Sequence, residues 1–429
     1  MFAIAGALGA AGVRAANRST GMTKMDLVVH NARVMTCDPG RTGLGIIEHG
    51  AVAMARGHIA WVGSDADRPA ASQELDAHGA LVTPGLVDCH THTIFGGDRA
   101  HEFALRAAGA SYREVAAKGG GIAATLRSTR AASGDLPGLL RSRLDVALCG
   151  GTTTMEVKSG YALTKAGELE LLAVIASVAR SHRVKLEPTL LAHWIPPERC
   201  GDRAAFVTEI CNEWIPEATA ATSVDVWCED SAFRVDEARA ILETARGARK
   251  VVRGHVGQFS DIGGAELLAE LGARSADHLE YVSDRGIAAL ARAGTVAVML
   301  PGACVQLRLP VPPVAKLRAA GVAMAVATDF NPGSSWCETL PIQLWLATTH
   351  FQMTVEEAWM GVTRNAAAAL GRRDIGQLVV GAAADLVIWR CDAPADVPYR
   401  YGASLVDVVV ASGEVVVASA RPCRPLEAE

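Results

Sequence analysis

Hydrophobic and polar residues follow one pattern at the two ends of the chain and another in its middle. From Asp26, the stretches DLVVHNARVMTCD and GAVAMARGHIAWVG alternate apolar with polar positions and are interrupted by Gly or Asn. This pattern is typical of β-strands joined by turns. It returns near the C-terminus in GQLVVGAAADLVIWR and LVDVVVASGEVVVA. We therefore expect a small composite β-sandwich domain formed by residues 26–84 and 375–429.

The middle of the chain alternates short apolar runs with stretches that have the apolar spacing of helices, such as AGELELLAVIASVARSH and DEARAILETARGARK. Eight runs are strand candidates: 86–92, 151–157, 184–193, 224–230, 251–258, 275–281, 295–301 and 322–330. Their starts lie about 34 residues apart, which matches the roughly 250 residues of a (β/α)8 barrel. We predict a TIM-like (β/α)8 barrel over residues 85–374. A doubly wound open sheet is the alternative, but no glycine-rich phosphate turn follows the first strand.

Composition indicates a globular protein with a large hydrophobic core, and it argues against a nucleic-acid-binding protein and a disulfide-rich protein. The 429 residues are 50% hydrophobic and carry a formal charge of −5. No basic stripe stands out, so we expect no nucleic-acid partner. The ten cysteines contain no CxxC pair, which favours free thiols in a reducing cytoplasm over disulfides or a thiolate zinc site.

Residues 1–25 form a separate leader. Its apolar run is too short to cross a bilayer, and it lacks the positive first region of a secretory signal. We expect this leader to be poorly ordered and without function, with the true start near Met22 or Met25. We therefore expect no membrane partner and a cytoplasmic location.

Histidines gather at the expected carboxyl ends of the strands, where TIM-barrel enzymes carry out their chemistry. Five of the twelve lie there: His90, His92, His193, His255 and His278. His90 and His92 are two residues apart, so in an extended strand they project to the same face. An isolated pair of this kind would more often be solvated in a loop, but the clustering on one rim favours a metal site. Asp329 ends the eighth strand. Three histidines and one aspartate suit zinc or iron and leave a position open to water, whose pKa a metal can lower to about 7.

Several stretches resemble the amidohydrolase superfamily and, within it, the imidazolonepropionase family of histidine degradation. PGLVDCHTH, the lone His255, ADHLEY and ATDFNPG resemble the superfamily. The combination of GGDRAHEF, GASY and KGGGI is more specific, and EVKSGYALT, LLAHWIPPE and GVTRNAAAALG support it. The likeness extends from about Asp26 to about Gly402.

The resemblance implies one divalent metal ion per chain, Zn2+ or Fe2+/Fe3+, held by His90, His92, His255 and Asp329. His278 would lie beside the metal-bound water and act as an acid or base together with Asp329. Binuclear relatives carry a bridging residue at the end of the fourth strand, where this chain has Glu229. Lys158, on the second strand, is in the wrong place to be a bridge. We therefore expect a single ion, with Glu229 outside the ligand set.

The resemblance also implies a substrate pocket. Arg99 would clamp the substrate carboxylate, because a planar guanidinium pairs with carboxylate through two parallel bonds. The other expected substrate contacts are Tyr112, Tyr161, His193, Gln258, Asn331, Gly333 and Ser334. The simpler alternatives are packing tyrosines, a core histidine at His193 and an ordinary turn at NPG.

Four segments depart from the family pattern: HVGQ, LAHW, SSWC and PGACVQLRLP. The first segment places Gln258 where the family usually has an acidic residue. Gln258 could orient the substrate ring or the water, but it could not act as a base.

The resemblance implies hydrolysis of 4-imidazolone-5-propanoate to N-formimidoyl-L-glutamate by a cytoplasmic homodimer. One alternative is another cyclic amidohydrolase or deaminase of the same superfamily, with the altered segments shaping the pocket for a different ring. The other is a catalytically silent metal-binding barrel.

Overall fold

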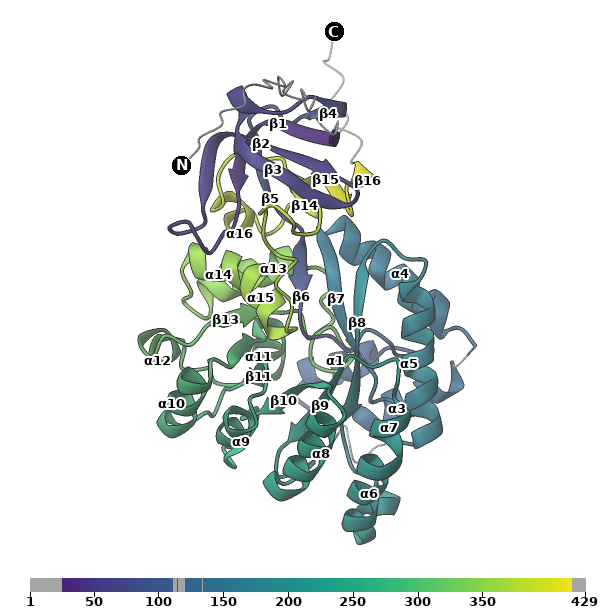
Figure 1. Ribbon diagram of the computed structural model, residues 1–429. Coiled ribbons are helices and arrows are strands. Elements are labelled where there is room, and N and C mark those ends of the chain that lie inside the picture. The colour runs from purple at the N-terminus through teal and green to yellow at the C-terminus, as the bar shows by residue number, and fades with distance from the viewer. Residues whose placement is uncertain (1–24, 111–113, 115–119, 133, 419–429) are drawn as a thin grey trace, which may run out of the picture.

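A computed structural model of the chain describes residues 25–110, 114, 120–132 and 134–418 (Figure 1). Residues 1–24 of the expected leader and the expected substrate contact Tyr112 lie outside the described residues.

A parallel sheet of eight strands lies at the centre of the larger part of the molecule, and this confirms the predicted barrel. The strands are β6 (Leu86–Asp88), β7 (Thr152–Lys158), β8 (Lys185–Ala192), β9 (Ser223–Cys228), β10 (Val251–Val256), β11 (Ser275–His278), β12 (Val296–Met299) and β13 (Met324–Val326). They pair in chain order from β6 to β13. The two edge strands meet just beyond their ends, where Thr91 and Phe330 form a parallel bridge. The backbone N–H of His92 donates to Phe330 O at 3.0 Å, and that of Asp329 donates to His90 O at 3.0 Å.

Each predicted barrel strand is present, but most end earlier than the sequence pattern indicated. The strand expected over 86–92 ends at Asp88, and the one expected over 322–330 covers only Met324–Val326. His90, His92, His193 and Asp329 lie in the connections that follow their strands, whereas His255 and His278 lie at the ends of β10 and β11. This arrangement puts their side chains on the open rim of the barrel.

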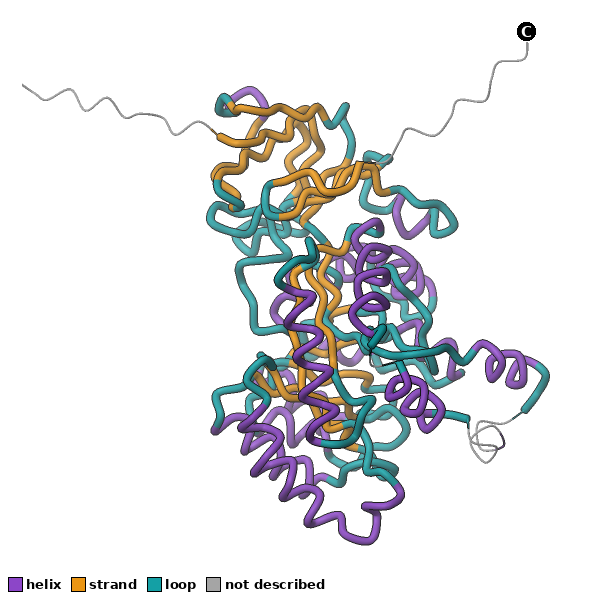
Figure 2. Tube along the Cα trace, turned by 90° about the vertical axis from the view of Figure 1, so that its right-hand side faces the viewer, coloured by secondary structure: helices purple, strands orange, loops and turns teal. Residues whose placement is uncertain are grey.

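Helices surround the barrel strands, as the tube view shows (Figure 2). Between β6 and β10 lie α1 (Ala100–Ala107), α3 (Ile122–Ala131), α4 (Leu136–Cys149), α5 (Lys165–Ala179), η2 (Pro197–Asp202), α6 (Arg203–Glu209), η3 (Ile210–Trp214), α7 (Ile215–Glu217) and α8 (Val235–Gly247). After β10 follow α9 (Gly264–Glu270), α10 (Asp284–Ala293), α11 (Pro301–Leu307), α12 (Val314–Ala319), α13 (Leu340–Thr349), α14 (Val355–Gly361), α15 (Arg364–Ala369) and α16 (Asp396–Tyr399). In α8 the buried residues are Ala238, Ile241, Leu242 and Ala245, which is the i, i+3, i+4, i+7 spacing of a helix packed on one face.

Strands from both chain ends form a second sheet, and this confirms the predicted composite β-domain. Its strands are β1 (Met25–Met35), β2 (Ile46–Ala55), β3 (His58–Ser64), β4 (Ala71–Asp76), β5 (Leu81–Pro84), β14 (Leu386–Trp389), β15 (Val406–Ala411) and β16 (Glu414–Ala418), and η1 (Asp65–Asp67) is a short 3-10 turn after β3. The main order is β16-β15-β14-β5-β1-β2-β3, with β4 paired to β1. Hydrogen bonds thus join these strands into one mixed sheet. A buried cluster that includes Val29, Val52, Val82, Ile388 and Val410 packs within it.

The β-domain and the barrel meet at Gly85, the one residue between β5 and β6. A Cβ at this position would lie 2.2 Å from Oγ1 of Thr153, so no larger residue fits the close passage of the chain. The N–H of Gly85 also donates to Asp385 O at 2.9 Å. The division of the chain into domains at 84/85 and 374/375 stays a prediction.

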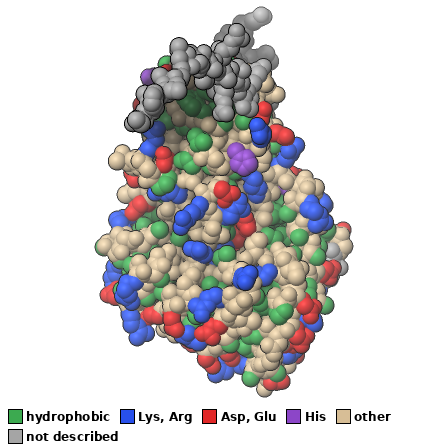
Figure 3. Space-filling model, viewed as in Figure 1, with side chains coloured by type: hydrophobic (Ala, Val, Ile, Leu, Met, Phe, Trp, Pro, Cys, Tyr) green, Lys and Arg blue, Asp and Glu red, His purple; other side chains and the backbone are tan. Residues whose placement is uncertain are grey.

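The outer surface carries mixed charge on the face drawn in Figure 3, where Lys and Arg side chains alternate with Asp and Glu. Among the described helices, none combines the length and apolar character needed to cross a membrane.

Candidate metal centre and substrate pocket

Four side chains meet on the rim of the barrel, and they are the four expected metal ligands. His90 and His92 follow β6, His255 lies on β10, and Asp329 follows β13; all four are buried. Nε2 of His90 lies 3.5 Å and Nε2 of His92 lies 3.4 Å from Oδ1 of Asp329. Nε2 of His255 lies 3.3 Å from Nε2 of His92.

The spacing of these atoms suits a metal ion. Two ligand atoms that each lie about 2.0–2.1 Å from one tetrahedral ion are roughly 3.3 Å apart. The group His90, His92 and Asp329 brings its ligand atoms within 4.8 Å of one another, and so does the group His90, His255 and His278. Among the described atoms, the buried Nε2 of His90 has no hydrogen-bond partner. A buried nitrogen without a partner, in a cluster with a carboxylate, fits metal ligation better than packing.

Two aspartates, Asp277 on β11 and Asp225 on β9, orient the histidines. Nδ1 of His90 donates to Oδ2 of Asp277 at 2.6 Å, and Nδ1 of His255 donates to Oδ1 of Asp225 at 2.8 Å. Each bond places the proton on Nδ1 and leaves the lone pair of Nε2 for a metal. Burial lowers the pKa of both histidines, which also favours the neutral, ligating form.

A buried network of charges lies beneath these residues, within the barrel. Nζ of Lys158 donates to Glu156 and to Asp225, both at 2.7 Å. The Arg253 guanidinium lies 3.2 Å from Glu156 and 3.4 Å from Asp277. Burial alone would lower the pKa of Lys158, but Asp225 and Glu156 raise it above its ordinary value. The two cations therefore hold three carboxylates in place below the rim.

His278 and Asp329 reach the rim through unusual backbone conformations. Their φ angles are 82° and 50°, in the left-handed region that non-glycine residues rarely adopt. The ring centroid of His278 lies 5.8 Å from that of His90 and 5.5 Å from that of His255. Burial raises the pKa of Asp329 to about 7 in the metal-free protein. For His278, burial would lower the pKa, but Glu280 and Asp329 raise it overall.

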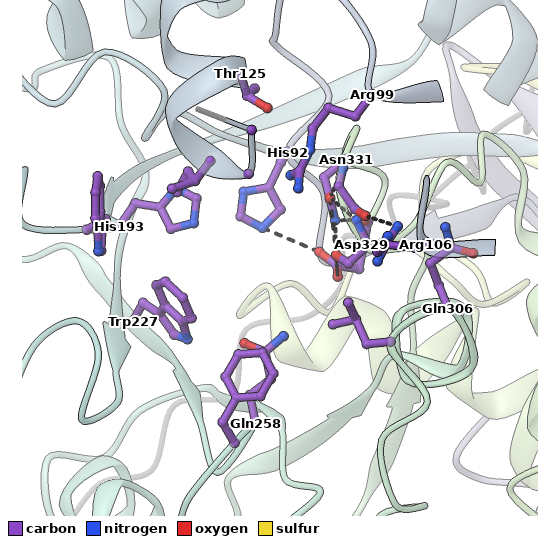
Figure 4. Close-up of a pocket in the computed structure, with 18 of the residues that line it drawn as sticks. His92, Arg99, Arg106, Thr125, His193, Trp227, Gln258, Gln306, Asp329 and Asn331 are labelled. Atoms are coloured by element: carbon purple, nitrogen blue, oxygen red, sulfur yellow. Dashed lines mark hydrogen bonds and ion pairs between the residues drawn. The ribbon is translucent and has the colours of Figure 1, made fainter. Parts of the chain in front are cut away.

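A pocket of about 880 Å³ opens above the rim. Within the described residues it is lined by most of the expected site: His92, Arg99, Tyr161, His193, His255, Gln258, His278, Asp329, Asn331, Gly333 and Ser334. His90 lies beneath this lining and is fully buried. In Figure 4, His193 and Trp227 occupy one side of the pocket and Arg99 the other. The structure therefore brings three of the four expected ligands and the described substrate contacts together in one cavity, with His90 directly below.

The guanidinium of Arg99 is held by Glu102, three residues later in α1. Nε and Nη2 both lie 2.8 Å from Oε2 of Glu102. Glu102 is itself buried and accepts from the N–H of Gly121 at 3.0 Å. Nη1 lies against Gly333, where a Cβ would come within 2.2 Å of it. Arg106, about one helical turn after Glu102 in α1, donates to Gly333 O at 3.2 Å.

The loop after β13 is a tight turn, as its NPG sequence indicated, and it also lines the pocket. Oδ1 of Asn331 accepts from the N–H groups of Gly333 and Ser334, both at 2.8 Å. Nδ2 of Asn331 donates to Asp329 O at 2.6 Å. Asn331 therefore forms an ordinary turn and also belongs to the pocket, because its side chain fixes the loop that carries Asp329 and Ser334.

Three further expected residues occupy defined positions. Nδ1 of His193 donates to Gly160 O at 3.0 Å, and burial lowers its pKa to about 4. The ring of Tyr161 lies 5.5 Å from that of His193 between centroids. Glu229 accepts from the N–H groups of Gln258 at 2.6 Å and Phe259 at 3.1 Å. Its carboxylate therefore anchors the loop after β10.

The segments that depart from the family pattern reach the pocket to different extents. Gln258 from HVGQ and Trp194 from LAHW line it, as do Val305–Arg308 from PGACVQLRLP. Trp336 from SSWC packs against Phe95 instead, with ring centroids 5.5 Å apart.

Sequence reasoning missed the residues that support the site. Asp225, Glu156 and Arg253 received no role, although each interrupts an apolar strand. A charged residue within a strand that is buried on both faces is a signal for an internal polar network. The Arg99–Glu102 pair also had a signal, because residues three apart on a helix are neighbours.

Comparison with known proteins places the chain among the amidohydrolases. A family model described as "Amidohydrolase family" matches residues 263–417. The imidazolonepropionase of Acidiphilium cryptum is 47% identical over 379 residues, covering 86% of this chain and 94% of that protein. The imidazolonepropionase of Methylobacterium nodulans is 47% identical over 387 residues, covering 88% of this chain and 96% of that protein.

Solved structures share the fold at low sequence identity. An atrazine chlorohydrolase from Arthrobacter aurescens, complexed with zinc, has a TM-score of 0.70 at 17% identity and covers 94% of this chain and 97% of its own. An adenosine deaminase from Xanthomonas campestris with bound zinc has a TM-score of 0.65 at 19% identity and covers 92% of this chain and 93% of its own. At these identities the likeness supports the two-part architecture alone.

Proposed function

The chain belongs to the imidazolonepropionase family of amidohydrolases, and from this premise we propose that its rim pocket hydrolyses 4-imidazolone-5-propanoate to N-formimidoyl-L-glutamate. The observation that carries the proposal is the shared cavity of His92, His255 and Asp329 with Arg99. This cavity would place the ring of the substrate at the metal centre and its propionate carboxylate at the Arg99 guanidinium.

The metal would be held by His90, His92, His255 and Asp329. A bound Zn2+ or iron ion supplies a water of lowered pKa and polarises the carbonyl under attack. Zinc is our first candidate because the ligand set is imidazole and carboxylate.

The residues of the chain divide the proton transfers between them. Asp329, the one carboxylate among the four proposed ligands, would accept a proton from the attacking water. His278 would donate a proton to the ring nitrogen as its bond to the carbonyl carbon breaks. The carbonyl carbon becomes a carboxylate, and the nitrogen leaves as an N–H group. Gln258 can orient the ring or the water but cannot take a proton.

Substrate position follows from the groups on either side of the pocket. Arg99 would pair with the propionate carboxylate through the nitrogen that faces Gly333. His193 donates from Nδ1 to Gly160, so its Nε2 is free to accept from a ring N–H. Tyr161, Asn331 and Ser334 would complete the contacts.

We propose a single ion per chain. The Glu229 carboxylate is engaged by the backbone of the loop after β10 and by Oγ of Ser260 at 2.8 Å. Lys158 is engaged by Glu156 and Asp225. Elemental analysis should give one metal per chain for the parent and for Glu229→Ala. Two equivalents that are lost together in Glu229→Ala would contradict the proposal.

A substrate panel tests the function itself. Purified, metal-loaded protein should turn over 4-imidazolone-5-propanoate far faster than hydantoins, dihydropyrimidines or aminopurines. Preference for another ring would favour a different cyclic amidohydrolase or deaminase. We keep this alternative because Trp194 and Gln258, which depart from the family pattern, line the pocket. Bound metal with no hydrolysis of any ring would favour a silent barrel.

A cytoplasmic homodimer is the further proposal that the family resemblance supports. Analytical ultracentrifugation of the full chain and cell fractionation test the two parts separately.

A further inference from the structure

The turn after β11 breaks the alternation expected of a strand. Asp277 points into the barrel, where it accepts from Nδ1 of His90 at 2.6 Å. Successive residues of a strand point to opposite faces, so the next residue, His278, should point outward. Instead its ring lies 5.8 Å from that of His90 between centroids. Both neighbours therefore reach the same side of the sheet.

Two consecutive left-handed residues make this possible. The φ angles are 82° at His278 and 71° at Leu279. Neither is a glycine, and such conformations persist only where the surrounding structure holds them. The N–H of Leu279 donates to Val256 O at 3.1 Å, and that of Tyr281 donates to Gly257 O at 2.8 Å. The turn is thus fixed to the end of β10.

The same turn brings Glu280 beside Nδ1 of His278. Oε1 of Glu280 lies 3.6 Å from Nδ1 of His278, and the two side chains are 1% and 2% exposed. Among the described atoms, neither carboxylate oxygen of Glu280 nor Nδ1 of His278 has a hydrogen-bond partner. A buried carboxylate without partners does not stabilise a fold, and an apolar side chain of similar volume would be neutral or stabilising there. Folding alone therefore gives no reason for a carboxylate at this position.

We propose that Glu280 is a positioning residue that orients His278 for its proton transfer, an inference that rests on the proposed function. The carboxylate, 3.6 Å from Nδ1 of His278, is placed to accept a hydrogen bond from Nδ1–H after a small shift of either side chain. This bond fixes the tautomer and the tilt of the ring, and Nε2 is then the nitrogen that serves the substrate in the pocket. Glu280 is not one of the residues that line the pocket, and it is not among the four proposed metal ligands.

Two substitutions of similar volume separate this role from a packing role. Glu280→Met removes the acceptor, whereas Glu280→Gln keeps an oxygen that can accept from Nδ1–H. We expect kcat to fall about 10–100-fold in Glu280→Met and to stay within about fivefold of the parent in Glu280→Gln. KM and one metal per chain should be retained in both. The thermal midpoint of Glu280→Met should equal or exceed that of the parent.

Histidine-selective 15N NMR supplies a readout that does not depend on activity. The His278 signal, assigned by its loss in His278→Ala, should show a proton on Nδ1 in the parent and in Glu280→Gln. It should show a mixture of tautomers in Glu280→Met. Tyr281→Phe, in the same turn, is the matched control and should behave as the parent.

Three results would overturn the inference: a parental kcat in Glu280→Met, an equal loss in Glu280→Gln and Glu280→Met, or an unchanged His278 tautomer. If the parent itself does not hydrolyse 4-imidazolone-5-propanoate, the proposed function fails, and the NMR comparison still decides the role of Glu280.

Discussion

The carboxylate of Asp225 lies 2.8 Å from Nδ1 of His255 and 2.7 Å from Nζ of Lys158. One aspartate on β9 thus couples a proposed metal ligand on β10 to a buried cation on β7. The nitrogen of His255 that faces the other ligands is Nε2, 3.3 Å from Nε2 of His92. The interior of the barrel therefore orients the rim before any metal binds.

Asp225→Asn should weaken metal binding about 10–100-fold, because it removes the charge that orients and polarises His255. Competition with a chelator, followed by elemental analysis, measures this change. Lys158→Met is the matched control. It removes the same ion pair without touching His255, so it should lower the free energy of unfolding and leave metal affinity closer to that of the parent. Equal metal affinity in Asp225→Asn and the parent would exclude the orienting role.

Arg99→Lys tests the carboxylate clamp. Lysine keeps the charge but loses the planar fork and the paired contact with Glu102. We expect kcat/KM for imidazolonepropanoate to fall by the equivalent of about 1.5–3 kcal/mol. For a ring analogue without the carboxylate the loss should be small. A loss of the same size on both compounds would mean that Arg99 serves the structure of the loop instead.

Gly333→Ala should affect the same clamp without changing any charge. The new Cβ would lie 2.2 Å from Nη1 of Arg99, so the guanidinium has to move. We expect a higher KM for the carboxylate substrate and a kcat that changes less. Gly138→Ala is the control, since a Cβ there would meet nothing within 4 Å and helix α4 tolerates alanine better than glycine. A KM that stays parental in Gly333→Ala would contradict the close contact.

The stability of the protein should depend on pH through His193. Burial lowers its pKa to about 4 in the folded state, against about 6.5 in the unfolded chain. Between these values the unfolded state binds more protons, so the free energy of unfolding falls as pH decreases from 6.5 to 4. The contribution is at most about 3 kcal/mol and smaller where water in the pocket screens the ring. Urea titrations of the parent and His193→Asn over this range measure it, and parallel pH profiles would show that His193 does not contribute.

The strands and the rim ligands were predictable because both depend on local patterns. Apolar runs of strand length recur through the middle of the chain, and His90, His255 and Asp329 directly follow or end such runs. Strand ends were less predictable. A polar residue just beyond a strand can be extended, as His92 is near the Thr91–Phe330 bridge, without belonging to a ladder.

The supporting network could not be paired from sequence. Asp225 and Lys158 are 67 positions apart and meet only because β7, β8 and β9 lie side by side. Glu280 lies two residues from His278, but in a regular strand both side chains would point away from the rim ligands. The two left-handed residues bring His278 to the rim, and no glycine or asparagine marks them.

The division between metal ligand and proton carrier is the central claim. Asp329 is proposed as both a ligand and an acceptor, whereas His278 lies beside the ligands without being one of the four. The most direct test is metal content and turnover, measured together on His278→Ala and Asp329→Ala, with Gln258→Ala alongside. We predict that His278→Ala keeps close to one metal per chain and loses activity by about 10²–10⁴-fold. Asp329→Ala should lose both, and Gln258→Ala should be much the mildest. Metal-free His278→Ala protein, or a Gln258→Ala variant more impaired than His278→Ala, would contradict the account.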